Sequence, residues 1–249
     1  MKLVSAFSLF LILILGCSET KEKNVPGICI SFDDRYVEEW YDLRPMFEKY
    51  DARVTFFITQ FDSLTTTEVN MLQKLQSDGH EIGNHGALHV LSEYYIKDNS
   101  YDTYLENEII ANKDALNHYS FDATSFAYPY GAKHWFTDFL ISSHHSALRS
   151  DVPVNKEKDL TLMDEIYFDF DGSNEFYSVG FDYNYELTET MIANALTRAK
   201  LNNEVLCLHG HGPAEQGDYH FSIETLEFIL KEARRLKLEF FTYSELISE

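Results

Sequence analysis

The chain has 249 residues and a formal net charge of −21, with 41 acidic residues against 20 Lys and Arg. So acidic a chain argues against nucleic acid or an anionic membrane surface as a partner, and it suits a neutral or cationic substrate. The length allows one sizeable domain with a hydrophobic core, and there is no internal repeat or Pro/Gly-rich linker that would indicate a second domain.

The first 17 residues have the features of an export signal. Lys2 supplies a positive charge, residues 9–15 are apolar, and Gly16 precedes Cys17. The apolar run is short for a bilayer span, and a Cys in this place resembles a bacterial lipoprotein signal. We therefore predict a signal peptide over 1–17 with Cys17 as the lipidated residue, a polar tether over 18–24 and the functional domain over 25–249. The alternative is an ordinary signal peptide, or an uncleaved anchor, that happens to carry a Cys.

Strand-like and helix-like segments alternate along the rest of the chain. Helical periodicity, with a capping box at Thr65 and Glu68, predicts helices over 37–50, 65–75, 104–116 and 188–200 and an amphipathic helix with Ile223, Leu226, Ile229 and Ala233 on one face. Apolar runs predict buried strands over 25–32, 54–59, 125–128 and 204–208. Strands separated by such helices indicate βαβ units and a parallel sheet.

Polar groups follow three of the predicted strands. Asp33 and Asp34 come directly after the first, Tyr130 follows the strand over 125–128, and His209 ends the strand over 204–208. Active sites of parallel α/β proteins gather at the C-terminal ends of strands, so we expect these groups to share one site. Two simpler interpretations stay open, because the paired acids could cap the next helix and Tyr130 could lie in an ordinary turn.

His85 and His89 are candidate metal ligands. Four residues apart on a helical turn, they would project from one face and bind one cation. A His pair of this spacing is common on exposed helices, but a carboxylate at a strand end would complete a set that suits Zn²⁺ or a similar divalent ion. His80 has no such support and is expected to be structural.

Four segments, taken in order, resemble the NodB-type polysaccharide deacetylases, also called carbohydrate esterase family 4. They are SFDD at 31–34, HGALH at 85–89, YPYG at 128–131 and LCLH at 206–209. The resemblance implies a single-domain α/β fold, a deformed (β/α) barrel, in which the acidic and aromatic region over 151–185 forms strands and loops that cover part of the barrel. It also implies that Asp33 is the general base, and that Asp34 binds a divalent metal, Zn²⁺ or an ion such as Co²⁺, together with His85 and His89.

The same resemblance assigns the remaining roles. The backbone N–H of Tyr130 would stabilise the oxyanion. His209 would be the general acid, because imidazole can be protonated near neutral pH. His211 is a competing candidate two residues on, and Asp182 is the residue that best matches the family's support for the acid.

Two positions depart from the family pattern. Gly86 stands where members commonly have Ser or Thr, and Ala127 stands where many carry an Arg that contacts the base. Without that cation, Asp33 would lose a partner that favours its charged form. Arg35 and Arg149 are the residues that could compensate.

These features predict an exported, membrane-anchored lipoprotein, monomeric, that removes acetyl groups from the amino sugars of a polysaccharide or oligosaccharide. An O-acetyl esterase would use the same residues, and an impaired site would leave a carbohydrate-binding lipoprotein. The aromatic residues Tyr167, Phe168, Phe170, Phe176 and Tyr177 could stack on sugar rings, although most aromatics in such a run pack into cores. Cys29 and Cys207 are expected to be buried free thiols rather than a disulfide.

Overall fold

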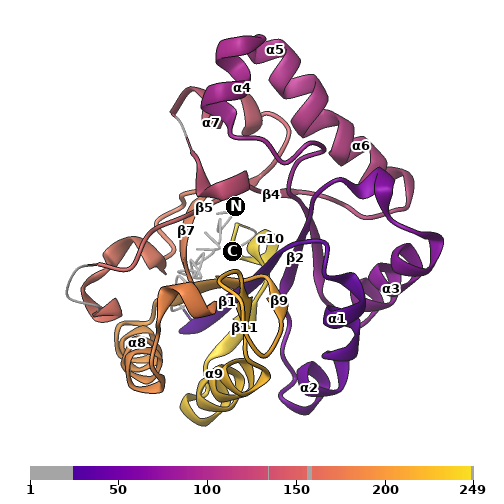
Figure 1. The fold of residues 1–249 in the computed structure, drawn as a ribbon. Helices are drawn as coiled ribbons and strands as arrows, with labels where there is room; N and C mark the ends of the chain where they lie inside the picture. The colour runs from indigo at the N-terminus through magenta and orange to yellow at the C-terminus, as the bar shows by residue number, and fades with distance from the viewer. Residues whose placement is uncertain (1–24, 134, 156–158, 248–249) are drawn as a thin grey trace, which may run out of the picture.

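The computed structural model describes residues 25–133, 135–155 and 159–247 (Figure 1). The predicted signal peptide, the lipidation site Cys17 and the tether lie outside the described residues. Within the described part of the chain, no helix has the length and apolar character needed to cross a membrane.

Seven parallel strands close into a barrel, because the last of them pairs again with the first. In order around the barrel they are β1 (Gly27–Asp34), β2 (Thr55–Ile58), β3 (Glu81–Asn84), β4 (Ser125–Ala127), β5 (Ala147–Asp151), β7 (Glu175–Gly180) and β8 (Val205–Gly210). The predicted (β/α) barrel in a single domain is therefore confirmed.

Two extra strands fill gaps where neighbouring barrel strands diverge. β11 (Glu239–Phe241) pairs with the first residues of β1, whereas β2 pairs with its last residues. β6 (Tyr167–Phe168) lies antiparallel to the start of β8, and β7 pairs with β8 through Val179 and Gly180. The region 151–185, expected to form strands and loops that cover part of the barrel, does contain strands, but β7 is itself one of the barrel strands.

Helices surround the barrel (Figure 1). On the sides near β1, β2 and β8 lie α1 (Val37–Asp42), α2 (Arg44–Lys49), α3 (Thr66–Ser77), α8 (Glu189–Asn202) and α9 (Ile223–Leu236). The single helix predicted over 37–50 is divided at Leu43, and Pro45 lies in the first turn of α2, where a missing N–H is tolerated. The capping box of Thr65 and Glu68 is confirmed. α9 buries Leu226, Ile229 and Ala233 as predicted, but Ile223 is 48% exposed.

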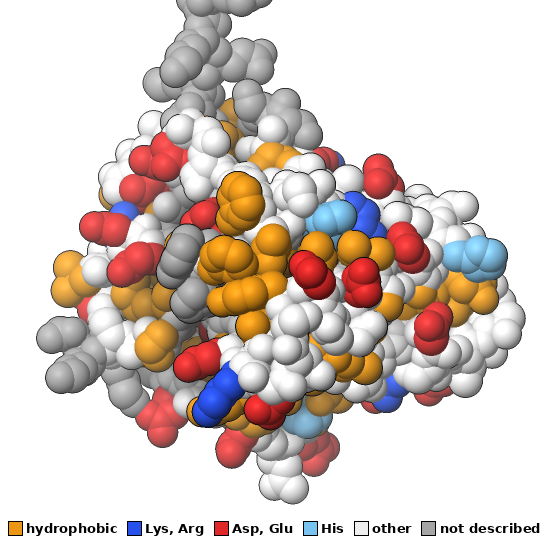
Figure 2. Space-filling view, turned by 90° about the horizontal axis from the view of Figure 1, so that it is seen from above, with side chains coloured by type: hydrophobic (Ala, Val, Ile, Leu, Met, Phe, Trp, Pro, Cys, Tyr) orange, Lys and Arg blue, Asp and Glu red, His pale blue; other side chains and the backbone are white. Residues whose placement is uncertain are grey.

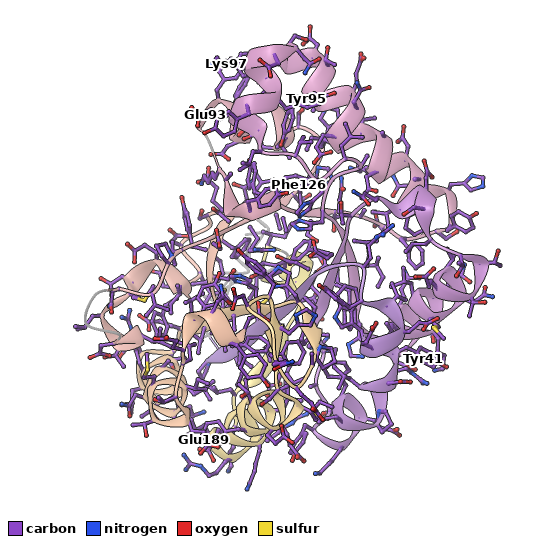
Figure 3. The ribbon with its side chains drawn as sticks, viewed as in Figure 1. Tyr41, Glu93, Tyr95, Lys97, Phe126 and Glu189 are labelled. Atoms are coloured by element: carbon purple, nitrogen blue, oxygen red, sulfur yellow. The ribbon has the colours of Figure 1, made fainter. Side chains whose placement is uncertain are left out.

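A second group of helices covers β3, β4 and β5. It consists of α4 (Ser92–Asp98), α5 (Tyr101–Tyr104), a π-helical segment (Leu105–Ile110), α6 (Ala111–His118) and α7 (Trp135–Ile141). Phe126 of β4 packs in a small core under these helices, and Tyr95 of α4 lies against it (Figure 3). On the outer side, hydrophobic side chains gather among acidic ones (Figure 2), and Tyr94 and Phe139 are exposed.

The interior of the barrel forms a core of its own, separate from the larger core between the strands and helices. Cys29, Phe57, Cys207 and Tyr243 pack together in it. Tyr243 begins α10 (Tyr243–Leu246), which lies within the ring of strands in Figure 1. Cys29 and Cys207 face each other on neighbouring strands, and both are buried free thiols as expected. A short parallel pair, β9 (Gly212–Pro213) and β10 (His220–Phe221), follows β8.

Candidate metal-dependent active site

The predicted site residues meet at one cavity of about 410 Å³, at the C-terminal ends of the barrel strands. Its lining includes all six residues that the sequence analysis gives catalytic or metal-binding roles: Asp33, Asp34, His85, His89, Tyr130 and His209. The acids end β1, and His209 lies near the end of β8. The structure therefore brings the six residues together at one rim, while their chemical roles stay predictions.

Asp34, His85 and His89 form a cluster that could hold a metal ion. Ligand atoms of the three lie within 4.8 Å of one another, and the Nε2 atoms of His85 and His89 are 3.7 and 3.3 Å from Oδ1 of Asp34. Nδ1 of His85 is 2.9 Å from the carbonyl oxygen of Ala127. Because a carbonyl only accepts, Nδ1 carries the proton and Nε2 presents its lone pair to the cluster. Two imidazoles and a carboxylate fit Zn²⁺ or a similar divalent ion.

The two histidines converge from a loop, so the expectation of a helical turn was wrong. β3 ends at Asn84, and the following loop has positive φ angles at Gly86 (82°) and His89 (56°). These angles bend the chain back so that the rings of His85 and His89 lie 4.9 Å apart. Asp34 also has a positive φ, of 84°. Such conformations cost energy in non-glycine residues and cluster at functional sites, which is consistent with ligands held in place by their surroundings.

Glu108, which the sequence analysis missed, holds this loop from behind. Its buried carboxylate accepts hydrogen bonds from the backbone N–H groups of Leu88, at 2.5 Å, and Val90, at 3.0 Å. It lies on the π-helical segment, a type of helix that is frequent at functional sites. A signal was present in the sequence, because Glu108 and Asn112 occupy helical spacings between the apolar residues Tyr104 and Leu116.

Gly86 is required because Glu108 occupies the space beside it. A Cβ added at Gly86 would lie 2.3 Å from Oε1 of Glu108. The position where family members commonly have Ser or Thr therefore has no room for a side chain here. The carboxylate of Glu108 organises the loop in place of a local hydroxyl.

Gly86→Ala is therefore expected to destabilise the protein by about 1–3 kcal/mol through overpacking and to weaken metal binding by roughly 10–100-fold through displacement of the loop. Denaturant unfolding and metal titration would measure the two effects. Gly172→Ala is a matched control, because Gly172 has a similar φ of 86° but no atom within 4 Å of the added Cβ. Equal effects of the two substitutions would contradict the proposed contact between Gly86 and Glu108.

Arg149 of β5 supplies the cation that Ala127 lacks. One guanidinium nitrogen of Arg149 is 2.5 Å from Oδ1 of Asp33 and also contacts Oδ2, and both side chains are buried. Burial alone would raise the pKa of Asp33, but the charge of Arg149 outweighs it and holds the pKa well below its usual range. The guanidinium of Arg35 instead donates a hydrogen bond to the hydroxyl of Ser63. Of the two residues considered from the sequence, Arg149 is the one that contacts Asp33.

Tyr130 lies at the mouth of the cavity. It belongs to the short 3₁₀ turn Pro129–Gly131 after β4, and its φ is 60°. The residue is 61% exposed, and its ring is 4.7 Å from that of His89. The turn thus places the ring of Tyr130 beside one of the proposed metal ligands, and the role of its backbone N–H in stabilising an oxyanion stays a prediction.

His209 is buried below the rim, with both ring nitrogens engaged. Nδ1 is 2.9 Å from the hydroxyl of Ser178, and Nε2 is 3.2 Å from the hydroxyl of Tyr185. Burial and then the charge of Arg149 lower the pKa of His209 well below its ordinary value. The imidazole is therefore neutral near pH 7.

Asp182 contacts His211 and not His209, which differs from the expected support for the acid. Nδ1 of His211 is 2.6 Å from Oδ2 of Asp182, and the backbone N–H of His211 donates to Oδ1 at 3.1 Å. The strand register explains the difference. Gly180 of β7 lies opposite His209 of β8, so Asp182, two residues further on, is level with His211.

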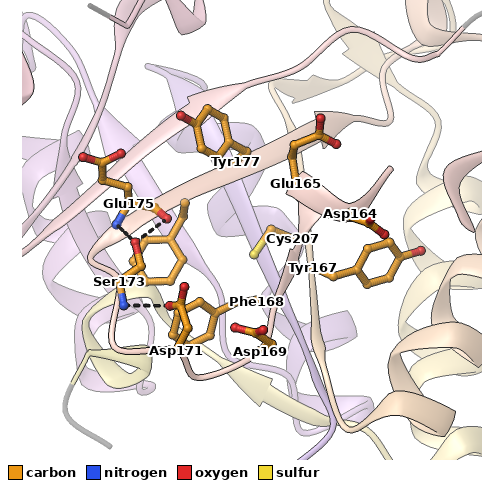
Figure 4. A pocket seen from close by; sticks show the side chains of 11 residues that line it. Asp164, Glu165, Tyr167, Phe168, Asp169, Asp171, Ser173, Glu175, Tyr177 and Cys207 are labelled. Atoms are coloured by element: carbon orange, nitrogen blue, oxygen red, sulfur yellow. Dashed lines mark hydrogen bonds between the residues drawn. The ribbon is translucent and has the colours of Figure 1, made fainter. Parts of the chain in front are cut away.

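A second cavity, of about 220 Å³, opens on the side of the barrel between β6 and β7 (Figure 4). Tyr167, Phe168, Phe176 and Tyr177 line it, and Cys207 lies at its wall. Of these rings, Tyr177 alone is not buried, so most of the aromatic run packs into the core. His80 is structural as expected: it is buried and its Nδ1 accepts from the backbone N–H of Val54 at 3.3 Å.

Comparison with known proteins places this barrel in a known class. The sequence model of the polysaccharide deacetylase family matches residues 20–143. A comparison with curated proteins gave no match. Among solved structures, a chitin deacetylase from Colletotrichum lindemuthianum aligns with a TM-score of 0.60 and 13% identity, covering 91% of this chain and 89% of the other.

Two further structures are similar. The peptidoglycan deacetylase PdaC from Bacillus subtilis aligns with a TM-score of 0.54 and 18% identity, covering 90% of this chain and 91% of the other. A family 4 acetyl xylan esterase from Clostridium thermocellum, in complex with cobalt, aligns with a TM-score of 0.57 and 16% identity, covering 89% and 90%. The protein belongs to the polysaccharide deacetylase family, also called carbohydrate esterase family 4, and is a hydrolase of that class.

Proposed function

We propose that the protein is a metal-dependent deacetylase that hydrolyses the N-acetyl amide of amino sugars in a polysaccharide or oligosaccharide. The observation that carries this proposal is that one cavity holds both a set of metal ligands and an ionised carboxylate. Asp34, His85 and His89 present three metal ligands, and Asp33 stands beside them as a carboxylate kept ionised by Arg149. These are the groups needed to activate a water molecule for attack on an acyl carbon.

Each residue of the cavity has a different role in the proposed reaction. A divalent ion held by Asp34, His85 and His89, which we propose to be Zn²⁺, would supply Lewis acidity for the carbonyl and lower the pKa of water. Asp33 takes a proton from the attacking water. The backbone N–H of Tyr130 donates to the oxygen on which negative charge develops. A histidine at the C-terminal end of β8 protonates the leaving nitrogen, the role that the sequence motif gives to His209.

Hydrolysis of an O-acetyl ester is the second candidate, favoured by the similarity to the acetyl xylan esterase. An ester needs less help from an acid, because an alkoxide is a better leaving group than an amine anion. A purely carbohydrate-binding role is less well supported. The two departures that suggested it are balanced in this chain by Arg149 beside Asp33 and by Glu108 beside Gly86.

A substrate panel tests this proposal. We expect the metal-loaded protein to release acetate from N-acetylglucosamine oligomers or peptidoglycan fragments faster than from acetylated xylan. Asp33→Asn should lower the rate by roughly 10²–10⁴-fold, the usual contribution of a general base. Faster release from acetylated xylan would identify the esterase instead. Release that Asp33→Asn leaves unchanged would show that this cavity does not carry the activity.

A further inference from the structure

We propose that His211, held by Asp182, is the group that protonates the leaving nitrogen, and that His209 is a positioning residue beneath it. His211 can have this role only if the proposed deacetylase function holds. It then takes the place that the sequence motif gives to His209.

The strand register sets the two histidines at different depths. His209 lies opposite Ser31 of β1, and Gly210 lies opposite Phe32. His211 therefore follows at the level of Asp33, two residues nearer the rim where the metal-ligand cluster lies. The side chain of His211 is 15% exposed and lines the cavity, whereas His209 is 2% exposed as a residue. A group that contacts the substrate is expected at the level nearer the rim, which is that of His211.

The hydrogen bonds of the His209 and His211 rings also distinguish the two residues. Both nitrogens of His209 contact hydroxyl groups, those of Ser178 and Tyr185. His211 uses Nδ1 to donate to Asp182, and no described residue hydrogen-bonds to its Nε2. Asp182 also accepts a hydrogen bond from the backbone N–H of His211. The indole N–H of Trp40 donates to the carbonyl oxygen of His211 at 2.7 Å. The ring is thus fixed in orientation with one nitrogen available to the cavity.

The charges around His211 favour its protonated form. Burial lowers its pKa, but the hydrogen bond to Asp182 and the charge of Asp33 outweigh burial and raise the pKa to about 9. The titratable groups around it are Asp182 after β7, Asp33 and Asp34 at the end of β1, His209 of β8 and Tyr219 before β10, and Tyr36 before α1 lines the same cavity. Since the pKa is raised, the imidazolium persists through neutral pH and is lost as the pH rises through about 9.

The proton transfers balance with His211 as the donor. Asp33 accepts a proton from water as the water oxygen bonds to the acetyl carbon. The carbon–nitrogen bond then breaks, its electron pair stays on nitrogen, and nitrogen takes the proton from Nε2 of His211. The ring is left neutral with its remaining proton on Nδ1, still donated to Asp182. It regains the other proton from solvent, to which Asp33 releases the proton that it took from water.

Substrates that differ in leaving group separate the two histidines. An amine must be protonated to leave, whereas the phenolate of 4-nitrophenyl acetate leaves without a proton. We expect His211→Gln in the full chain to lower kcat/KM on N-acetylglucosamine oligomers by roughly 10²–10⁴-fold and on 4-nitrophenyl acetate by less than about 10-fold. His209→Gln, the matched control, should affect both substrates to a similar extent.

Titration of the histidine ring nitrogens by NMR gives a readout that does not depend on turnover or on metal. We expect His211 to stay protonated through neutral pH and its pKa to fall in Asp182→Asn, with His209 neutral in both proteins. A neutral His211 at pH 7, or a selective loss on the amide in His209→Gln, would overturn the assignment while leaving the deacetylase function intact. No acetate release from any acetylated sugar by the wild type would refute the proposed function and, with it, the catalytic role of His211.

Discussion

Arg149→Met is expected to destabilise the protein by about 3–5 kcal/mol, because it leaves the carboxylate of Asp33 buried without a partner. Asp33 is 4% exposed and Arg149 is 1% exposed, so solvent cannot replace the lost contact. Activity should fall as well, since Arg149 orients the proposed base. Denaturant unfolding of Arg149→Met, Asp33→Asn and the double variant would measure the coupling between the two side chains.

The double variant Asp33→Asn with Arg149→Met should be more stable than Arg149→Met alone, because it removes the uncompensated charge. Arg235→Met is a control, since Arg235 pairs with Glu232 near the surface: the side chain of Arg235 is 60% exposed and that of Glu232 15%. Pairs of this kind contribute about 0–1 kcal/mol. If Arg149→Met cost no more than Arg235→Met, or if the two single effects simply added, the buried pair would not be coupled as the structure indicates.

His85→Ala is expected to weaken binding of Zn²⁺ by more than about 100-fold, since loss of a ligand should exceed the 10–100-fold cost of losing a residue that supports one. The ring is fixed by the carbonyl of Ala127 and directs Nε2 to the cluster. The loss should also remove the stabilisation that bound metal provides, about 2.7 kcal/mol at a free metal concentration 100 times Kd. Isothermal titration and thermal unfolding with and without Zn²⁺ would measure these effects.

His80→Ala is the matched control for that substitution. His80 is buried just before β3 but packs between Phe47 and Phe56, outside the cavity. It should lower stability without changing metal affinity. Equal metal binding by wild type and His85→Ala would contradict the ligand assignment.

Local sequence patterns predicted the elements that carry the site. Apolar runs marked β1 and β8, and the polar residues that follow such runs, such as Asp33, share one rim as parallel strands require. The capping box at Thr65 marked the start of α3 because its hydrogen bonds span three residues. These signals are local, and so they could be read without the fold.

The features that the sequence left open or missed depend on contacts between distant segments. Asp33 and Arg149 are 116 residues apart, so the sequence could name Arg149 only as one of two candidate partners. The spacing of His85 and His89 fits a helix as well as a loop, and the loop forms because Glu108 satisfies its backbone from another element. Asp182 meets His211 through the register of β7 and β8, which sequence spacing does not reveal.

The most direct test of the central claim is acetate release before and after the removal of metal. Chelated protein should release no acetate from N-acetylglucosamine oligomers, and one equivalent of Zn²⁺ or Co²⁺ should restore release in the wild type but not in His85→Ala. Activity that survives complete chelation, or that returns equally in His85→Ala, would contradict a metal-dependent deacetylase built on Asp34, His85 and His89.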